Sequence, residues 1–113
     1  MKAIGGNIVA ELQIKDRFTK NAIGEKIQNW KPVNTLTGFL DYQAGDSQYQ
    51  NYSSKIQEST HVFICDYVEL DSAVKAENSR MIIKDERYDV LLIDDPMELH
   101  YQLEIYLKYT GGQ

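Results

Sequence analysis

Residues 99–109 read LHYQLEIYLKY, and this stretch decides the fold. Every second side chain is apolar or aromatic over the whole stretch, and the side chains between them are mostly polar. A strand places alternate side chains on opposite faces, whereas a helix would scatter these apolar positions around its axis. The pattern therefore predicts a long strand with one buried face and one wet face, and it places His100 on the wet face.

Five further segments are rich in β-branched and aromatic residues and are expected to be strands. They are residues 7–15, 30–42, 60–67, 80–84 and 88–93. The run Tyr88–Ile93 is almost continuously apolar, which predicts a strand buried on both faces and ended by the turn Asp94-Asp95-Pro96. We place another turn at residues 85–87 and a single helical turn within residues 72–77. Six strands in 113 residues predict an all-β fold, a small antiparallel β-barrel, with a sandwich as the alternative.

Residues 43–57 do not fit this scheme, because they are polar, rich in small residues and without a period. A loop of this length inside a small domain is usually functional or disordered. A mobile hairpin tip is one interpretation. Tyr49 and Tyr52 favour a contact role, since exposed tyrosines supply contact area at a low cost in entropy.

The chain has 113 residues and a net charge of −5, which favours one domain over residues 1–113, with flexible ends at 1–6 and 110–113. Its lone Cys65 cannot form an internal disulfide, and nothing follows a zinc spacing. No apolar run approaches the roughly 20 residues that span a bilayer, and residues 1–10 do not read as a signal peptide. The acidic balance argues against indiscriminate binding to nucleic acid.

The charge is unevenly distributed along the chain. Residues 1–57 carry seven basic and five acidic side chains, net +2, and residues 58–113 carry five basic and twelve acidic side chains, net −7. The basic side chains fall in an expected front loop and the acidic ones near the end. They are Lys15, Arg17, Lys20, Lys26 and Lys31 against Asp94, Asp95, Glu98 and Glu104. One interpretation is a solvated surface, and the other is a polarised molecule whose two faces meet different partners or each other in a ring.

The chemistry-bearing residues offer no catalytic, cofactor or metal site. His61 and Cys65 would share a strand but lie about 13 Å apart along it, too far for a nucleophile pair. His100 with Asp94, Asp95 or Glu98 matches no metal motif, although oxygen ligands with one imidazole form a possible set. A hydrolase using His100 with Asp95 or Glu98 is the remaining enzyme alternative. We expect a protein that is not an enzyme.

Several segments in order resemble the successive signatures of one family. They are Thr37–Asp41 (TGFLD), Ser59–Tyr67 (STHVFICDY), Asn78–Met81 (NSRM), Tyr88–Val90 (YDV), Asp94–Met97 (DDPM) and His100–Leu107 (HYQLEIYL). The chain resembles the phage head-closure proteins, which are the head–tail adaptor or stopper subunits of long-tailed phages of Gram-positive bacteria. The resemblance covers residues 30–113, and residues 1–29 carry no pattern that matches it.

The resemblance implies a structural virion protein, made in the host cytoplasm and located at the head–tail interface. Such proteins form a homo-oligomeric ring below the portal-bound adaptor, a dodecamer in the virion, while the isolated protein can be a monomer. The ring closes the DNA channel and docks the tail terminator or tail completion protein, with no membrane contact and no sequence-specific binding to the packaged DNA. The family's long loop reaches into the channel, which here implicates Gly45, Asp46, Gln48, Tyr49, Gln50, Tyr52 and Lys55. The charge pattern adds an expected partner interface of Arg17, Lys20, Lys26, Asp94, Asp95 and Glu98. The alternative function is a small β-barrel protein-binding module without a virion role, which would stay monomeric beside portal and tail components.

Overall fold

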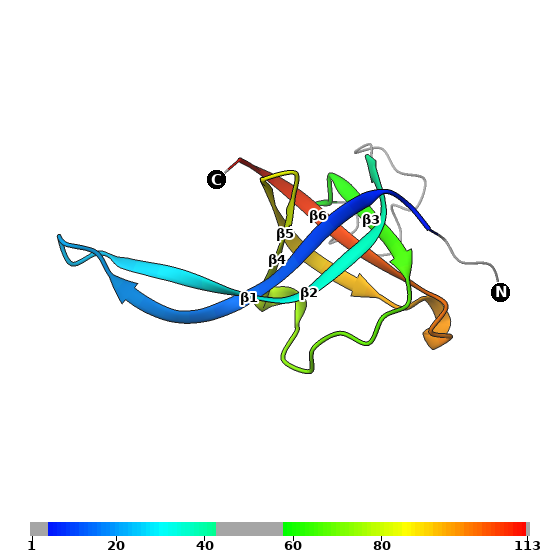
Figure 1. Cartoon of the computed structure of the whole chain (residues 1–113), viewed down its shortest axis with the longest axis horizontal. Helices are drawn as coiled ribbons and strands as arrows, with labels where there is room; N and C mark the ends of the chain where they lie inside the picture. Colours follow the sequence, from blue (N-terminus) through cyan, green and yellow to red (C-terminus); the bar gives the residue numbers. More distant parts are fainter. Residues whose placement is uncertain (1–4, 43–57, 113) are drawn as a thin grey trace.

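The computed structural model describes residues 5–42 and 58–112. Its strands are β1 (Ile8–Lys20), β2 (Lys26–Tyr42), β3 (His61–Asp66), β4 (Ser79–Ile83), β5 (Glu86–Asp94) and β6 (Gln102–Gly112). Two 3-10 turns, η1 (Ala76–Asn78) and η2 (Pro96–Glu98), precede β4 and β6. All neighbouring strands are antiparallel and close into a barrel in the order β1-β2-β3-β6-β5-β4 (Figure 1). The predicted antiparallel barrel and its short helical turn are thereby confirmed, and no helix in the described part of the chain is long and apolar enough to cross a membrane.

The core fills the inside of the barrel, and β6 supplies its centre. Leu103, Ile105 and Leu107 are 3% exposed or less and pack in one cluster with Phe63 and Met81. Their period of two confirms the strand predicted from residues 99–109. The strand begins later than expected, because η2 and the residue after it turn the chain first. Leu99 and Tyr101 are consequently half exposed, and His100 precedes the strand.

The prediction that residues 88–93 are buried on both faces is wrong. Tyr88 and Val90 point into the core, while Asp89 between them is exposed. Leu91 is an extra residue, since Val90 pairs with Leu107 and the next pair is Leu92 with Tyr106. Such a β-bulge reverses the alternation that follows it. The apolar run therefore records a change of face rather than burial on both sides.

The turn between β4 and β5 lies at Lys84 and Asp85, one residue earlier than predicted. Both residues have positive φ angles, 52° and 64°, so the connection is a two-residue hairpin of the primed type. That geometry matches the twist of antiparallel strands, which allows Glu86 to begin β5 at once. Glu86 and Arg87, predicted as turn residues, pair with Gly112 and Gly111 of β6.

The expected basic front loop is also wrong, because β1 and β2 continue through it as one hairpin that is longer than either predicted strand. Two β-bulges lie in this hairpin, one at Val33 and one at Asp16-Arg17 opposite Asn29. Pro32, next to the first bulge, sits where a missing N–H is tolerated, although it lies well inside the strand and not near its start. Bulges bend and twist a two-stranded ribbon, and the far part of the β1–β2 hairpin projects from the barrel (Figure 1).

The two ends of the described chain are attached to the barrel. Gly6, with φ of 112°, lies against the backbone of Gly38, where a Cβ atom would come within 2.3 Å of the Gly38 carbonyl carbon. At the other end, β6 runs through residues 110–112, and the flexibility expected of the two ends stays a prediction. Thr110 attaches this end to β5, because its Oγ1 accepts a hydrogen bond from Nε of Arg87 at 3.2 Å and donates one to the Arg87 carbonyl at 3.0 Å. Residues 43–57, the predicted long loop, lie outside the described residues.

Candidate interaction surfaces

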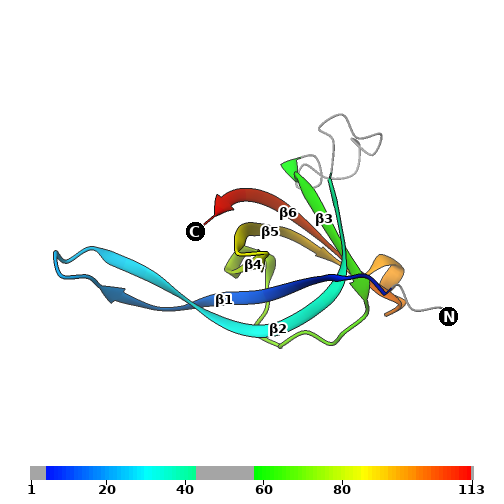
Figure 2. The same ribbon diagram turned by 45° about the horizontal axis from the view of Figure 1, so that its top comes forward.

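The distal part of the first hairpin, residues 15–31, projects from the barrel as a two-stranded ribbon, here named the arm (Figure 2). β1 pairs with β4 only over residues 10–14, and β2 pairs with β3 only over residues 38–42. Within the arm the two strands therefore pair only with each other. Every residue from Lys15 to Lys20 is exposed, so neither face of that strand is buried.

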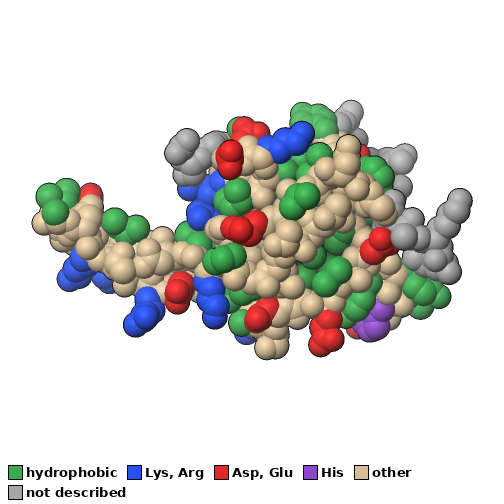
Figure 3. Space-filling model, in the orientation of Figure 1, with side chains coloured by type: hydrophobic (Ala, Val, Ile, Leu, Met, Phe, Trp, Pro, Cys, Tyr) green, Lys and Arg blue, Asp and Glu red, His purple; other side chains and the backbone are tan. Residues whose placement is uncertain are grey.

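The arm is basic and the rest of the chain is acidic. Residues 15–31 carry five basic and two acidic side chains, net +3, and the remaining residues carry seven basic and fifteen acidic ones, net −8. On the face shown in Figure 3, Lys and Arg gather mainly over the arm and the adjacent edge of the barrel. Among the described residues no carboxylate forms an ion pair with an arm lysine or arginine. The positive charge of the arm is thus left to solvent or to a partner.

Local hydrogen bonds explain how the arm keeps its shape without a core. The side chain of Asn21 closes the tip, because its Oδ1 accepts hydrogen bonds from the backbone N–H groups of Ile23 and Glu25, both at 3.0 Å. The side chain of Gln28 spans the bulge, since its Nε2 donates to the carbonyls of Asp16 at 2.8 Å and Asn29 at 2.7 Å. Side-chain hydrogen bonds therefore stabilise the arm, whereas apolar packing stabilises the barrel.

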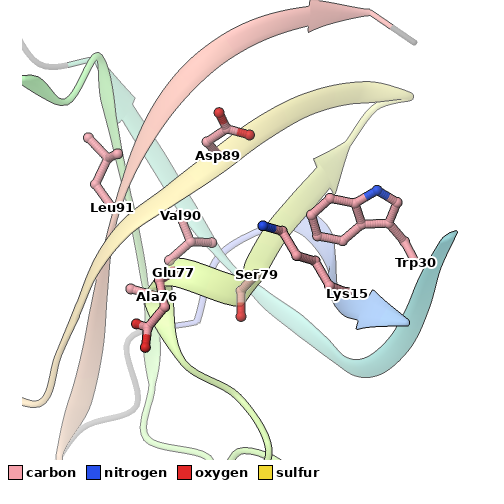
Figure 4. Close-up of a pocket in the computed structure, with 8 residues that line it drawn as sticks. All are labelled: Lys15, Trp30, Ala76, Glu77, Ser79, Asp89, Val90 and Leu91. Carbon is pink, nitrogen blue, oxygen red and sulfur yellow. The ribbon is translucent and has the colours of Figure 1, made fainter. Parts of the chain in front are cut away.

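The arm is fixed to the barrel at its root. The guanidinium of Arg80 on β4 lies over the Trp30 ring, 4.3 Å from its centroid, and its Nε donates to Oε1 of Gln13 at 2.8 Å. Next to this stack is a shallow pocket of about 300 Å³. Lys15 and Trp30 line it from the arm, and Ala76, Glu77, Ser79, Asp89, Val90 and Leu91 line it from the barrel (Figure 4). The root is therefore held to the barrel by side-chain contacts, whereas the strands beyond it pair only with each other.

At the end of the barrel opposite the arm lie the last residue of β5 and the connection to β6, residues 94–101, here named the acidic end (Figures 1 and 2). Asp95 organises it, because one carboxylate oxygen accepts the backbone N–H of His100 at 3.0 Å and the other contacts Nδ1 of the same residue. Met97, Glu98 and His100 have φ angles of 57°, 55° and 58°, a conformation that non-glycine residues rarely adopt. Such backbone persists only where the surroundings enforce it, and it concentrates at functional sites.

Negative charge accumulates at this end. Partial burial, together with the nearby charges of Glu104 and Asp95, raises the pKa of Asp94 above its ordinary value. Exposed apolar side chains lie beside these carboxylates. They are Met97 at 86% exposed, Leu99 at 50% and Tyr101 at 52%. A surface that is both acidic and apolar favours a basic and apolar partner.

The six predicted interface residues fall into two groups at opposite ends of the molecule. Arg17, Lys20 and Lys26 lie on the arm, and Asp94, Asp95 and Glu98 lie at the acidic end. Their role as an interface stays a prediction. The sequence analysis missed the exposed apolar residues of the arm, Phe18, Ile23 and Ile27. The signal was present, because Asn21 and Gly24 bound a short turn between two β-rich segments, which is typical of a hairpin.

An aromatic cluster lies where the chain leaves β2 for residues 43–57. The His61 ring contacts Tyr42, Tyr88 and Tyr109 at centroid distances of 5.5, 5.2 and 6.3 Å. Burial lowers the pKa of His61, partly offset by the charge of Glu86. The predicted loop residues Gly45, Asp46, Gln48, Tyr49, Gln50, Tyr52 and Lys55 all lie outside the described residues, so their role stays a prediction.

The titratable side chains of the described residues form no metal cluster of three or more His, Cys, Asp or Glu. Cys65 is 1% exposed, and burial followed by the nearby charge of Asp66 raises the pKa of its thiol to about 11. His100 contacts Asp95, but this pair closes a turn on the surface. These arrangements can hold structure and charge, and they do not assemble a nucleophile with a base.

A family model described as phage head completion protein matches residues 7–108. The chain belongs to this family. The match begins at residue 7 and includes the arm. The prediction that residues 1–29 share no pattern with head-closure proteins is therefore wrong for most of that segment. The protein is accordingly a structural component of the phage head, and its place is the virion.

The fold of this head completion protein also occurs in a solved structure. The solution structure of protein SF1141 from Shigella flexneri 2a matches with a TM-score of 0.64 and 14% sequence identity, covering 97% of each chain. At that identity the likeness concerns the fold alone. A comparison with curated protein sequences finds no match.

Proposed function

We propose that this head completion protein forms a ring at the portal vertex that closes the DNA channel after packaging and presents a docking surface to the tail. The observation that carries the proposal is the family match over residues 7–108. The portal-bound adaptor lies above the proposed ring and the tail completion protein below it. The ring is a dodecamer in this proposal, and the host is a Gram-positive bacterium. The protein acts as a structural part and not as an enzyme.

The charge distribution supports a role around DNA. Outside the arm the chain carries a net charge of −8, so a channel lined by barrel surface repels phosphate. Nonspecific DNA binding depends on Lys and Arg neutralising phosphates, and outside the arm only seven basic side chains stand against fifteen acidic ones. DNA can then pass the ring without adhering to it.

Residues 43–57 are the proposed stopper. They follow the exposed Tyr42 and return to β3 beside the aromatic cluster around His61, so both ends of the segment start from one side of the barrel. The stopper residues in this proposal are Gly45, Asp46, Gln48, Tyr49, Gln50, Tyr52 and Lys55. A polar segment of this kind can block a channel without contributing to the core.

The experiment is to add the purified protein to DNA-filled, tail-less heads of the parent phage and to image the portal vertex. New ring-shaped density there, together with DNA that stays inside the heads, is the expected result. A monomer that leaves the vertex unchanged and the DNA leaking would remove the proposal and favour the protein-binding module.

The stopper role has a separate test. Deleting residues 45–54 is expected to leave a folded barrel with an unchanged circular dichroism spectrum, because that segment is polar and rich in small residues. The deletion variant should still bind the portal vertex, and DNA should leak from the heads that carry it. Heads that retain their DNA with this variant would assign the closure to another part of the protein.

A further inference from the structure

The arm has the properties of a surface that awaits a partner. Phe18, Ile23 and Ile27 are 61%, 79% and 43% exposed on a ribbon that has no core of its own. An isolated two-stranded ribbon is marginal in water, and exposed apolar side chains rimmed by charge mark contact sites. The arm's basic side chains are also without carboxylate partners among the described residues. Charge and apolar surface thus coincide on one projecting element.

The acidic end carries the complementary properties. Met97, Leu99 and Tyr101 expose apolar surface, and Asp94 and Glu98 supply negative charge. The Asp95–His100 contacts and the packing of the Tyr67 ring against His100, at a centroid distance of 4.5 Å, hold this surface in one conformation. A preformed surface loses little entropy when it binds.

We propose that the arm of one copy docks on the acidic end of the next copy, so that a head-to-tail contact links neighbours in the ring. This inference rests on the proposed function, because it names the contact by which that ring forms. Two different patches at opposite ends of one subunit generate a heterologous interface, and such an interface closes into a ring when its rotation allows. Neither patch meets the other within one chain (Figures 1 and 2).

The dimensions suit this contact. The six exposed residues from Lys15 to Lys20 extend about 20 Å at about 3.3 Å per residue. The molecule measures 51 Å along the arm and 29 and 24 Å across. An arm can therefore reach across most of a neighbouring barrel.

Packaged DNA is the other polyanion that a basic ribbon could meet. The arm does not match it well, because three exposed apolar side chains lie among only five basic ones and two acidic ones. Phosphate binding draws on Lys and Arg and gains nothing from exposed apolar side chains, whereas a protein partner can bury them. We therefore assign the arm to the neighbouring copy and leave DNA as an outcome of the test.

A four-residue charge exchange tests the assignment. One variant carries Lys20→Glu and Lys26→Glu, a second carries Asp94→Lys and Glu98→Lys, and a third carries all four changes. We expect each of the first two to occupy tail-less heads at least about tenfold less than the unchanged protein, and the third to recover most of the loss. Recovery requires that the partner of the arm is the same chain. Loss without recovery would assign the arm to DNA or to another protein, and no loss in either variant would show that the patches are not in contact.

Cysteine crosslinking on the same heads gives a second readout. The chain's own Cys65 is buried and its thiol pKa is about 11, so added cysteines react alone. A protein with both Ile23→Cys and Met97→Cys should form a ladder of multimers under oxidation, whereas either single variant should form none. Dimers from Ile23→Cys alone would show that arm tips meet each other, and the absence of a ladder would contradict the head-to-tail contact.

These results separate the two proposals. If the unchanged protein forms no density at the portal vertex and does not retain DNA, the proposed function fails. If it does both while the exchanged variants behave as the unchanged protein, only the arm contact fails.

Discussion

The barrel and the arm are built from the same strands, yet they are stabilised in different ways. In the barrel, β1 alternates buried Ala10, Leu12 and Ile14 with less buried residues, and the same strand has no buried residue after Lys15. A barrel strand gains free energy from the apolar surface that it removes from water. The arm gains little, and it is held instead by hydrogen bonds that the Asn21 side chain accepts and the Gln28 side chain donates. One region therefore stabilises the subunit, and the other is available to join subunits.

The largest difference between the two regions should appear when a phenylalanine is removed from each. Phe63 is fully buried in the barrel and Phe18 is 61% exposed on the arm. Phe63→Ala should lower the free energy of unfolding by about 3–5 kcal/mol, because it leaves a cavity in the core. Phe18→Ala should change it by less than about 0.5 kcal/mol. Urea unfolding measures both, and equal losses would mean that the arm packs on the barrel.

Substituting one glycine in the barrel and one in the arm should show the same difference in stability, with a smaller effect. A Cβ on Gly38 would lie 2.2 Å from the carbonyl oxygen of Ile64, where β2 and β3 approach closely, whereas a Cβ on Gly24 at the arm tip would meet nothing within 4 Å. We expect Gly38→Ala to cost about 1–3 kcal/mol, as overpacking does. Gly24→Ala strains only a positive φ of 85°, and the tip can open locally, so its cost in global stability is smaller. Thermal unfolding of the two variants gives the order, and a larger loss for Gly24→Ala would contradict it.

The smallest effect concerns pH and should come from the barrel alone. Burial lowers the pKa of His61 from its ordinary 6.5, so the folded protein binds a proton less readily than the unfolded chain. His61 therefore costs no stability above pH 6.5, and stability is lost as the pH falls through 6.5 towards the lower folded pKa. The free energy of unfolding between pH 7 and pH 5.5 should fall less steeply in His61→Phe than in the unchanged protein. An unchanged slope in the variant would mean that other groups cause the fall.

The sequence predicts the barrel well because every second residue of a strand faces the core, so apolar residues recur with a period of two. Leu103, Ile105 and Leu107 alternate without interruption, and the predicted strand is found. Residues 88–93 mislead because the bulge at Leu91 moves the apolar positions from one face to the other. A bulge is a matter of pairing with the partner strand, which the order of residues within one strand does not show.

The failure to predict the arm also has a physical cause. The arm residues of β1 are exposed on both faces, so their sequence shows no alternation of apolar and polar residues. The charged segment from Lys15 to Lys20 therefore resembles a loop. The charge polarity itself is visible in the sequence, and only the fold shows that its two halves lie at opposite ends of the molecule. The apolar residues that accompany each charge patch become meaningful once their exposure is known.

The most direct test of the account is a cryo-electron microscopy reconstruction of DNA-filled, tail-less heads that carry the purified protein. The account predicts a closed ring below the portal in which each arm, residues 15–31, lies on residues 94–101 of the next subunit. A vertex without a ring, or a ring whose arms point away from the neighbouring subunits, would contradict it.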